Sequence, residues 1–302
     1  MASANRPGSA STISELLSSG GHSFSFEFFP PKTDEGERQL WQAIRELEPL
    51  QPSFVSVTFG AGGSTRDRTV RATRRILEET TLLPMAHLTC VGATVAELRA
   101  VIGSYADAGL RNVLALRGDP PTGIGSEWVQ TPGGLAHADE LVELVKSLGD
   151  FSVGVAAFPE KHPESGSLDD DARVLAAKQA AGAEFAVTQL FFRVEDYVAL
   201  VDRARAVGCT IPILPGIMPL TNINQIERFS VLSGTAFPDD LAARFRAVGD
   251  DPVAVHALGI EAASEFGQAL LDAGSPGLHF YTLNRSTSSR EIYTNLGLSS
   301  LV

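Results

Sequence analysis

One carboxylate interrupts an otherwise apolar and aromatic stretch near the start of the chain, residues 23–32. The alternation predicts a strand that turns Phe24, Phe26 and Phe28 into a core and Glu27 to the opposite face. In a barrel wall that face lines the interior, and catalytic groups lie at the carboxyl ends of barrel strands. A low dielectric there would raise the pKa of Glu27 and keep a proton available near neutral pH, as a general acid needs. The alternative is a charge on the solvated face of an edge strand.

Further polar side chains follow the other predicted strands, at the ends where barrel enzymes carry their sites. The most informative group is Arg117-Gly118-Asp119, because Asp119 could accept from ring N–H groups of a heterocycle while Arg117 donates to a carbonyl or phosphate. A structural salt bridge is the alternative. A functional role is favoured for His162, on a loop, whereas for His87, in an apolar strand, functional and structural roles are equally favoured. The full set at this rim is Glu27, Thr58, His87, Arg117, Asp119, His162, Gln189, Asn284 and Arg285.

Two mechanisms are excluded. A Schiff-base aldolase needs a lysine inside the barrel, but the lysines at 32, 146, 161 and 178 all fall in loops or helices. A metal-dependent hydrolase needs a His-x-His pair or acids on adjacent strand ends, and the sequence has neither, so no metal is expected. Residues 60–64, Gly-Ala-Gly-Gly-Ser, resemble a phosphate-cradling loop, although a tight turn explains them equally well.

Strand-like and helix-like segments alternate along the whole chain. Eight strands, each followed by helix, predict an α/β fold of the (β/α)8 TIM barrel class rather than a doubly wound open sheet, since roughly 250 residues suffice for such a barrel. We expect residues 1–20 to be a flexible tail with a short helix capped at Thr12, the first ten residues being disordered, and residues 21–302 to be a single barrel domain with extra helices. The strands begin near residues 23, 54, 85, 112, 153, 185, 211 and 278, with helices near 94–108, 137–148, 168–181, 194–206, 222–232, 239–247 and 252–273.

The chain of 302 residues carries a net charge of −12, with scattered basic residues. Nucleic acid and anionic membranes are therefore poor partners. Cys90 and Cys209 have no CxxC or His-rich companion, so neither a disulfide framework nor a zinc site is expected. The sequence has no apolar leader and no run long enough to span a bilayer. These features predict a cytoplasmic protein, which could form a homo-oligomer.

Several short motifs occur in order from residue 24 to about residue 297. They are Phe26-Glu27-Phe28-Phe29-Pro30-Pro31, Val55-Ser56-Val57-Thr58, His87-Leu88-Thr89-Cys90, Ala115-Leu116-Arg117-Gly118-Asp119, Pro159-Glu160 with His162-Pro163-Glu164, Thr188-Gln189, Pro215-Gly216-Ile217 and His279-Phe280-Tyr281-Thr282-Leu283-Asn284-Arg285. Together they closely resemble the methylenetetrahydrofolate reductases of the bacterial type. Such motifs in order are far more specific than any one alone.

The resemblance implies a (β/α)8 barrel that holds FAD at the carboxyl ends of its strands. In that family NADH or NADPH gives hydride to the flavin and leaves. The substrate 5,10-methylenetetrahydrofolate then takes its place and becomes 5-methyltetrahydrofolate for methionine synthesis. Glu27 matches the family's general acid, which protonates N10 so that the five-membered ring opens to an iminium carbon that accepts hydride.

The resemblance also assigns roles to other residues. Asp119 matches a catalytic acid that binds the pterin and adjusts the flavin. Substrate or nicotinamide contacts would be Asp119, Gln189, Gln225, Phe229 and Arg285. Flavin contacts would be Thr58, Phe59, Ala61, His87, Arg117, Gly118, Asp119, His162, Asp171 and Lys178.

The chain departs from the well-known bacterial members at several flavin-binding positions. Phe59, His137 and Phe158 stand where those members carry tyrosine, and Val174 and Ala177 where they carry asparagine and arginine. Each lost hydrogen bond would weaken flavin binding by roughly 0.5–1.5 kcal/mol. Direct hydride transfer from NAD(P)H without flavin is therefore an alternative route to the same product. More distant alternatives are another folate-acting barrel lyase or transferase, and a folate binder without catalysis.

Overall fold

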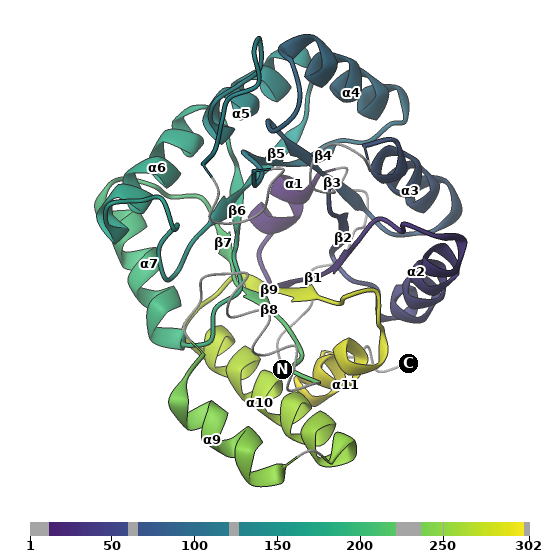
Figure 1. Cartoon of the computed structure of the whole chain (residues 1–302), viewed down its shortest axis with the longest axis vertical. Coiled ribbons are helices and arrows are strands. Elements are labelled where there is room, and N and C mark those ends of the chain that lie inside the picture. The colour runs from purple at the N-terminus through teal and green to yellow at the C-terminus, as the bar shows by residue number, and fades with distance from the viewer. Residues whose placement is uncertain (1–11, 60–65, 121–126, 222–236, 250, 299–302) are drawn as a thin grey trace.

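Nine parallel strands form one sheet in the computed structural model, which describes residues 12–59, 66–120, 127–221, 237–249 and 251–298 (Figure 1). Along the sheet the order is β7-β6-β5-β4-β3-β2-β1-β9-β8. The strands are β1 (Ser23–Phe28), β2 (Phe54–Val57), β3 (Pro84–Thr89), β4 (Asn112–Leu116), β5 (Ser152–Ala157), β6 (Phe185–Thr188), β7 (Ile213–Leu214), β8 (Gly216–Ile217) and β9 (Gly277–Tyr281).

The two ends of this order, β7 and β8, are halves of one strand separated by Pro215. β7 pairs with β6 and β8 pairs with β9, so the sheet turns back on itself into a nearly closed barrel with eight strand positions. Proline cannot donate to a ladder, but the Pro215 carbonyl accepts from the His279 N–H at 2.9 Å. The predicted (β/α)8 barrel is confirmed, with each predicted strand found within a few residues of its expected start.

Helices surround the barrel (Figure 1). In the described residues these α-helices are α2 (Asp34–Leu47), α3 (Arg66–Glu79), α4 (Val95–Asp107), α5 (Ala138–Leu148), α6 (Leu168–Ala180), α7 (Val194–Ala206), α9 (Asp239–Val248), α10 (Pro252–Asp272) and α11 (Thr287–Asn295), whereas α1 (Ile13–Ser18) lies at one end of the barrel. The helices predicted between 94 and 206, and those in 239–273, are confirmed. The predicted helix 222–232 and the predicted disorder of residues 1–10 lie outside the described residues. No helix in the described ranges combines the length and apolar character needed to cross a bilayer.

The outer face of β1 builds the layer between barrel and helices. Phe24, Phe26 and Phe28 are fully buried, and the Tyr293 ring of α11 lies 5.9 Å from the ring centroids of Phe24 and Phe26. Glu27 points the other way, to His279 inside the barrel. The two faces predicted for this strand are therefore confirmed.

The amino-terminal end of the barrel is closed by α1, which Figure 1 shows inside the ring of strands. Thr12 and Glu15 form the predicted capping box. Ile13 packs among inward-facing apolar side chains that include Phe54, and its N–H donates to Asn112 Oδ1 at 2.8 Å. This apolar plug leaves the carboxyl ends of the strands as the end of the barrel that can receive a ligand.

Candidate active site

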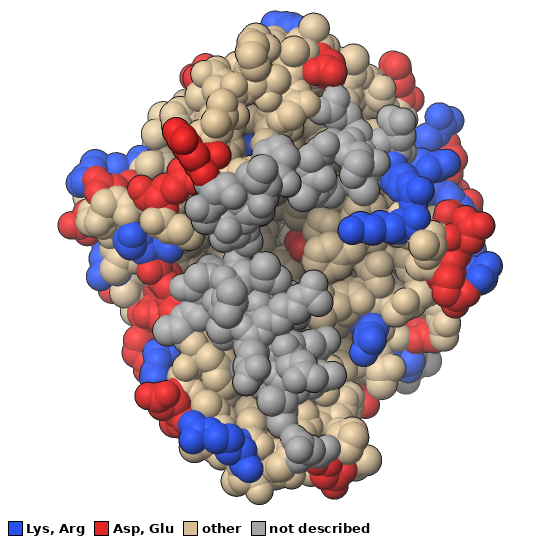
Figure 2. Space-filling model, in the orientation of Figure 1, with Lys and Arg blue, Asp and Glu red and all other residues tan. Residues whose placement is uncertain are grey.

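A pocket of about 420 Å³ opens at the carboxyl ends of the strands. This size suits a small-molecule site, and its walls mix apolar side chains with a few polar groups as such sites do. Figure 2 shows this face of the molecule hollowed at its centre, with acidic side-chain atoms in the hollow. The structure brings eight of the predicted residues to the pocket lining: Glu27, Thr58, His87, Arg117, Gly118, Asp119, His162 and Gln189.

Glu27 lies at the floor of the pocket, and its side chain is 8% exposed. Among the described residues, each polar contact to its carboxyl group reaches one atom, Oε2: His279 Nε2 at 3.1 Å, Ser56 Oγ at 3.4 Å and His87 Nε2 at 3.5 Å. Oε1 forms no hydrogen bond with any described residue and is not among the buried atoms without a partner. One oxygen is therefore held while the other stays open to the pocket.

The charge state of Glu27 depends on opposing effects. Burial raises the pKa of its carboxyl group, but the charge interaction with His87, the interactions with His279 and the hydrogen bond from Ser56 together outweigh burial and hold that pKa below its ordinary value. The sequence-based expectation of a raised pKa is therefore wrong, because the surrounding side chains favour the charged carboxylate. Burial also lowers the pKa of His87 from 6.5 to about 4, so that imidazole is neutral at neutral pH.

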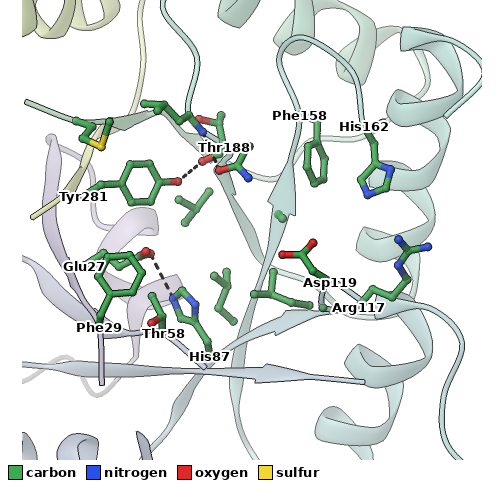
Figure 3. A pocket seen from close by; sticks show the side chains of 18 of the residues that line it. Glu27, Phe29, Thr58, His87, Arg117, Asp119, Phe158, His162, Thr188 and Tyr281 are labelled. Atoms are coloured by element: carbon green, nitrogen blue, oxygen red, sulfur yellow. Dashed lines mark hydrogen bonds and ion pairs between the residues drawn. The ribbon is translucent and has the colours of Figure 1, made fainter. Parts of the chain in front are cut away.

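Asp119 faces Glu27 across the pocket, and both carboxyl groups are directed into it (Figure 3). Asp119 is exposed and forms no ion pair with a described residue. The guanidinium of Arg117 instead donates two hydrogen bonds to Glu164, both of 2.7 Å, and lies 5.0 Å from the Trp128 ring centroid. The alternative of a structural salt bridge therefore holds for Arg117, whose partner is Glu164. The Asp119 carboxylate takes no part in it and is available to a ligand.

Two predicted flavin contacts lie behind the pocket wall rather than in it. The Asp171 carboxylate accepts from the His162 N–H at 2.7 Å, and the Lys178 ammonium donates to the Ala156 carbonyl at 3.0 Å. Burial lowers the pKa of Lys178 from 10.5 to about 8, although Asp171 opposes this effect. Both side chains thus brace the loop that carries His162 and the end of β5.

Two other predicted site residues that the structure describes do not line the pocket. Phe59 packs against the core between barrel and helices, and Arg285 is exposed beyond the lining residues. Ala61, Gln225 and Phe229 lie outside the described residues, so their predicted contacts are untested.

Tyr281 and His279 belong to the site but were not individual candidates in the sequence. Tyr281 lines the pocket, and its hydroxyl donates to the Thr188 carbonyl at 2.5 Å. His279 lies two positions earlier in β9, is fully buried, and contacts Glu27 directly. The spacing of two along a strand could have revealed that both point to the barrel interior with Glu27.

This fold and this site define a class of protein: a (β/α)8-barrel enzyme with a buried acid on the floor of a polar-rimmed pocket. Known proteins narrow the class. The family model for methylenetetrahydrofolate reductase matches residues 12–297. The 5,10-methylenetetrahydrofolate reductase of Escherichia coli K12 is 40% identical over 274 residues, which are 91% of this chain and 90% of that protein. The chain therefore belongs to the methylenetetrahydrofolate reductase family and is an oxidoreductase.

Other relatives agree with this placement. The methylenetetrahydrofolate reductase (NADH) 1 of Arabidopsis thaliana is 38% identical over 297 residues, which are 95% of this chain and 50% of that protein. Among solved structures, an uncharacterized protein from Clostridium thermocellum that binds two copies of 5-methyl-5,6,7,8-tetrahydrofolic acid has a TM-score of 0.66 at 13% identity. That likeness covers 96% of this chain and 100% of the other, and it supports the fold.

Proposed function

We propose that this chain reduces 5,10-methylenetetrahydrofolate to 5-methyltetrahydrofolate, with NADH or NADPH as the source of hydride and Glu27 as the general acid. The observation that carries the proposal is the carboxyl group on the pocket floor, with Oε2 held by its neighbours and Oε1 open to the pocket. The names of the relatives support the choice of substrate.

The proton is needed because hydride can reach the methylene carbon only after the bridge between N5 and N10 opens. Protonation makes N10 a leaving group and leaves an iminium carbon on N5. Glu27 would supply this proton from Oε1, so it must be neutral in the substrate complex. A substrate ring over Oε1 excludes water from that oxygen, which strengthens the effect by which burial raises the pKa of Glu27.

The pocket fits a flavin as the hydride carrier. Leu114, Leu116 and Val187 give it apolar walls for a flat ring, and the buried Nε2 of His87 makes no hydrogen bond with a described residue. When bound, FAD would take hydride from the nicotinamide and deliver it to the folate. The lining residues that would hold FAD are Thr58, His87, Arg117, Gly118, Asp119 and His162.

A second candidate is the same reduction by direct hydride transfer from NADH or NADPH, without flavin. Val174 and Ala177 favour it, because both are exposed on α6 and offer no polar side-chain atom to a dinucleotide. Phe158 packs edge-on against the His162 ring, with centroids 4.8 Å apart, and also lacks a hydrogen-bond donor. The role of Glu27 is the same in this mechanism.

The visible spectrum of the purified protein, recorded anaerobically before and after addition of NADH, separates the two candidates. A flavin band that bleaches supports FAD. A colourless protein that oxidises NADH only when given 5,10-methylenetetrahydrofolate supports direct transfer. If 5,10-methylenetetrahydrofolate causes no oxidation of NADH or NADPH, whether or not the protein contains flavin, the proposed reduction is contradicted. A lyase, a transferase or a folate binder would then be favoured.

Glu27→Gln tests the general acid. The amide cannot give a proton to N10, so we expect folate reduction to fall at least a thousandfold, near the upper part of the roughly 10²–10⁴ range for general acid catalysis. Turnover of 5,10-methylenetetrahydrofolate is the measurement, and any reduction of bound flavin by NADH should persist. Glu291→Gln is the matched control, because Glu291 pairs with His256 at the surface. Near-normal folate turnover by the Glu27 variant would refute the assignment.

A further inference from the structure

His279 occupies the same layer of the barrel interior as Ser25. The two are register partners on the adjacent strands β9 and β1, so their side chains point inward together. The His279 side chain has no exposed surface. Its ring lies nearly parallel to Phe54, with centroids 5.9 Å apart, and Tyr281 meets it edge-on at 5.6 Å. Packing therefore restricts the orientation of the imidazole.

Both ring nitrogens of His279 have partners. Nδ1 lies 2.7 Å from Ser25 Oγ, and Nε2 lies 3.1 Å from Glu27 Oε2. A carboxylate can only accept, so the hydrogen in the second contact belongs to Nε2. In a neutral ring Nδ1 then accepts from the Ser25 hydroxyl, for which no other partner is found in the described residues. Ser25 thus favours the tautomer that donates to Glu27.

We propose that His279 is the positioning residue of the general acid: supported by Ser25, its Nε2–H holds Oε2 of Glu27 and so directs the transferable proton to Oε1. This inference rests on the proposed role of Glu27. The same tautomer serves both charge states of Glu27, because in the neutral acid Oε2 is a carbonyl oxygen and still accepts. Without this donor the proton could settle on Oε2, which lies among His279, Ser56 and His87.

The groups that face His279 define how its loss would change the pH dependence. Glu27 of β1 and Tyr281 of β9 are the titratable side chains in contact with it, and His87 of β3 lies on the far side of Glu27, 3.5 Å from the same oxygen. The hydrogen bond from His279 lowers the pKa of Glu27. Its removal should therefore raise that pKa. In a plot of kcat against pH, the fall in rate on the alkaline side, where the acid loses its proton, should then move to higher pH.

The test compares His279→Leu, which removes both nitrogens, with His279→Gln, whose amide can still donate to Oε2. We expect the leucine variant to lose about tenfold to a hundredfold in kcat with little change in KM, as loss of one hydrogen bond to a charged group implies. The fall in its kcat on the alkaline side should move to higher pH. The glutamine variant should recover most of both changes, and Ser25→Ala should show a smaller effect in the same direction. His256→Leu, at the surface, is the matched control.

A second readout does not depend on turnover. The ¹⁵N spectrum of the histidine side chains should show His279 protonated at Nε2, and a ¹³C titration of the Glu27 carboxyl should show a higher pKa in His279→Leu than in the wild type. An Nδ1-protonated ring, an unmoved Glu27 titration, or equal defects in the leucine and glutamine variants would overturn the inference. An active Glu27→Gln variant would instead refute the proposed function.

Discussion

The chemistry of this protein depends on a polar layer inside an otherwise apolar barrel. Ser25, Ser56 and His279 have no exposed surface: Ser56 and His279 contact the Glu27 carboxyl group, and Ser25 supports His279 from behind. Below them lies the apolar cluster closed by α1. A buried polar group is tolerated only when hydrogen-bonded, and here the bonds gather on one carboxyl oxygen, which leaves the other for chemistry.

Asp119→Asn should change folate reduction but not stability. Asp119 has no ion-pair partner among the described residues, so the substitution should leave stability within about 0.5 kcal/mol of the wild type. It removes the charged acceptor that would bind the pterin, so folate reduction should fall roughly tenfold to a hundredfold. Steady-state folate kinetics and urea unfolding measure the two effects, with Asp202→Asn on the exposed face of α7 as the control. Unchanged folate kinetics would assign Asp119 a structural role.

The stability of the fold at acid pH should depend on His87. Its pKa is lowered by burial from 6.5 to about 4, so between these pH values the unfolded chain binds a proton that the folded chain does not. The His87 contribution to stability is therefore present above pH 6.5 and declines as pH falls toward 4, by about 3 kcal/mol in all. Urea unfolding at several pH values should show a shallower acid decline for His87→Gln than for the wild type. Parallel curves would mean that His87 titrates normally.

The strand made of β7 and β8 shapes one wall of the pocket. Pro215 interrupts it, and Gly216 follows at a point where a Cβ atom would lie 2.6 Å from the Tyr281 hydroxyl oxygen and 2.5 Å from its ring. Tyr281 can therefore lie over β8 only because residue 216 has no side chain. That position lets its hydroxyl reach the Thr188 carbonyl and its ring form part of the pocket wall.

Gly216→Ala tests this arrangement. The added methyl group should push the Tyr281 ring into the pocket, raise KM for the folate severalfold and cost about 1–3 kcal/mol of stability. Folate kinetics and urea unfolding are the measurements. Gly103→Ala is the control, because a Cβ there meets no atom within 4 Å and alanine favours the interior of α4. A normal KM in the Gly216 variant would show that the tyrosine does not need this position.

At the scale of the whole molecule, the barrel offers its ligand site at one end only. The α1 plug closes the opposite end with apolar side chains, and the pocket collects side chains from β1, from β3 to β6, from β9 and from Thr58 directly after β2. A ligand held by so many strands binds the folded chain and not the unfolded one, so binding is linked to stability of the whole barrel.

This linkage gives a prediction for FAD. At a concentration about 100 times its Kd, FAD should add roughly 2.7 kcal/mol to stability and raise Tm by about 4–5 °C in a chain of this length. Thermal unfolding with and without FAD measures the shift, with adenosine monophosphate as a control ligand that lacks the flavin ring. A Tm that responds to a folate but not to FAD would favour the direct hydride mechanism.

The sequence by itself determined the features that depend on local periodicity and capping. Alternation in residues 23–28 predicted which side chains of β1 face the helices and that Glu27 faces the interior, and the Thr12 capping box predicted α1. These signals are local, because a strand's two faces and a helix's first turn are defined within a few residues. The several different motifs in order were then sufficient to indicate the family.

Only the tertiary structure decided which side chains meet. His279 reaches Glu27 across 252 positions of sequence, and Arg117 pairs with Glu164 rather than with Asp119 two residues away. Such partners are set by strand register and by loop geometry, which no local pattern encodes. The lowered pKa of Glu27 was unpredictable for the same reason: burial alone raises it, and the direction follows from the imidazoles that the closed barrel brings to one oxygen.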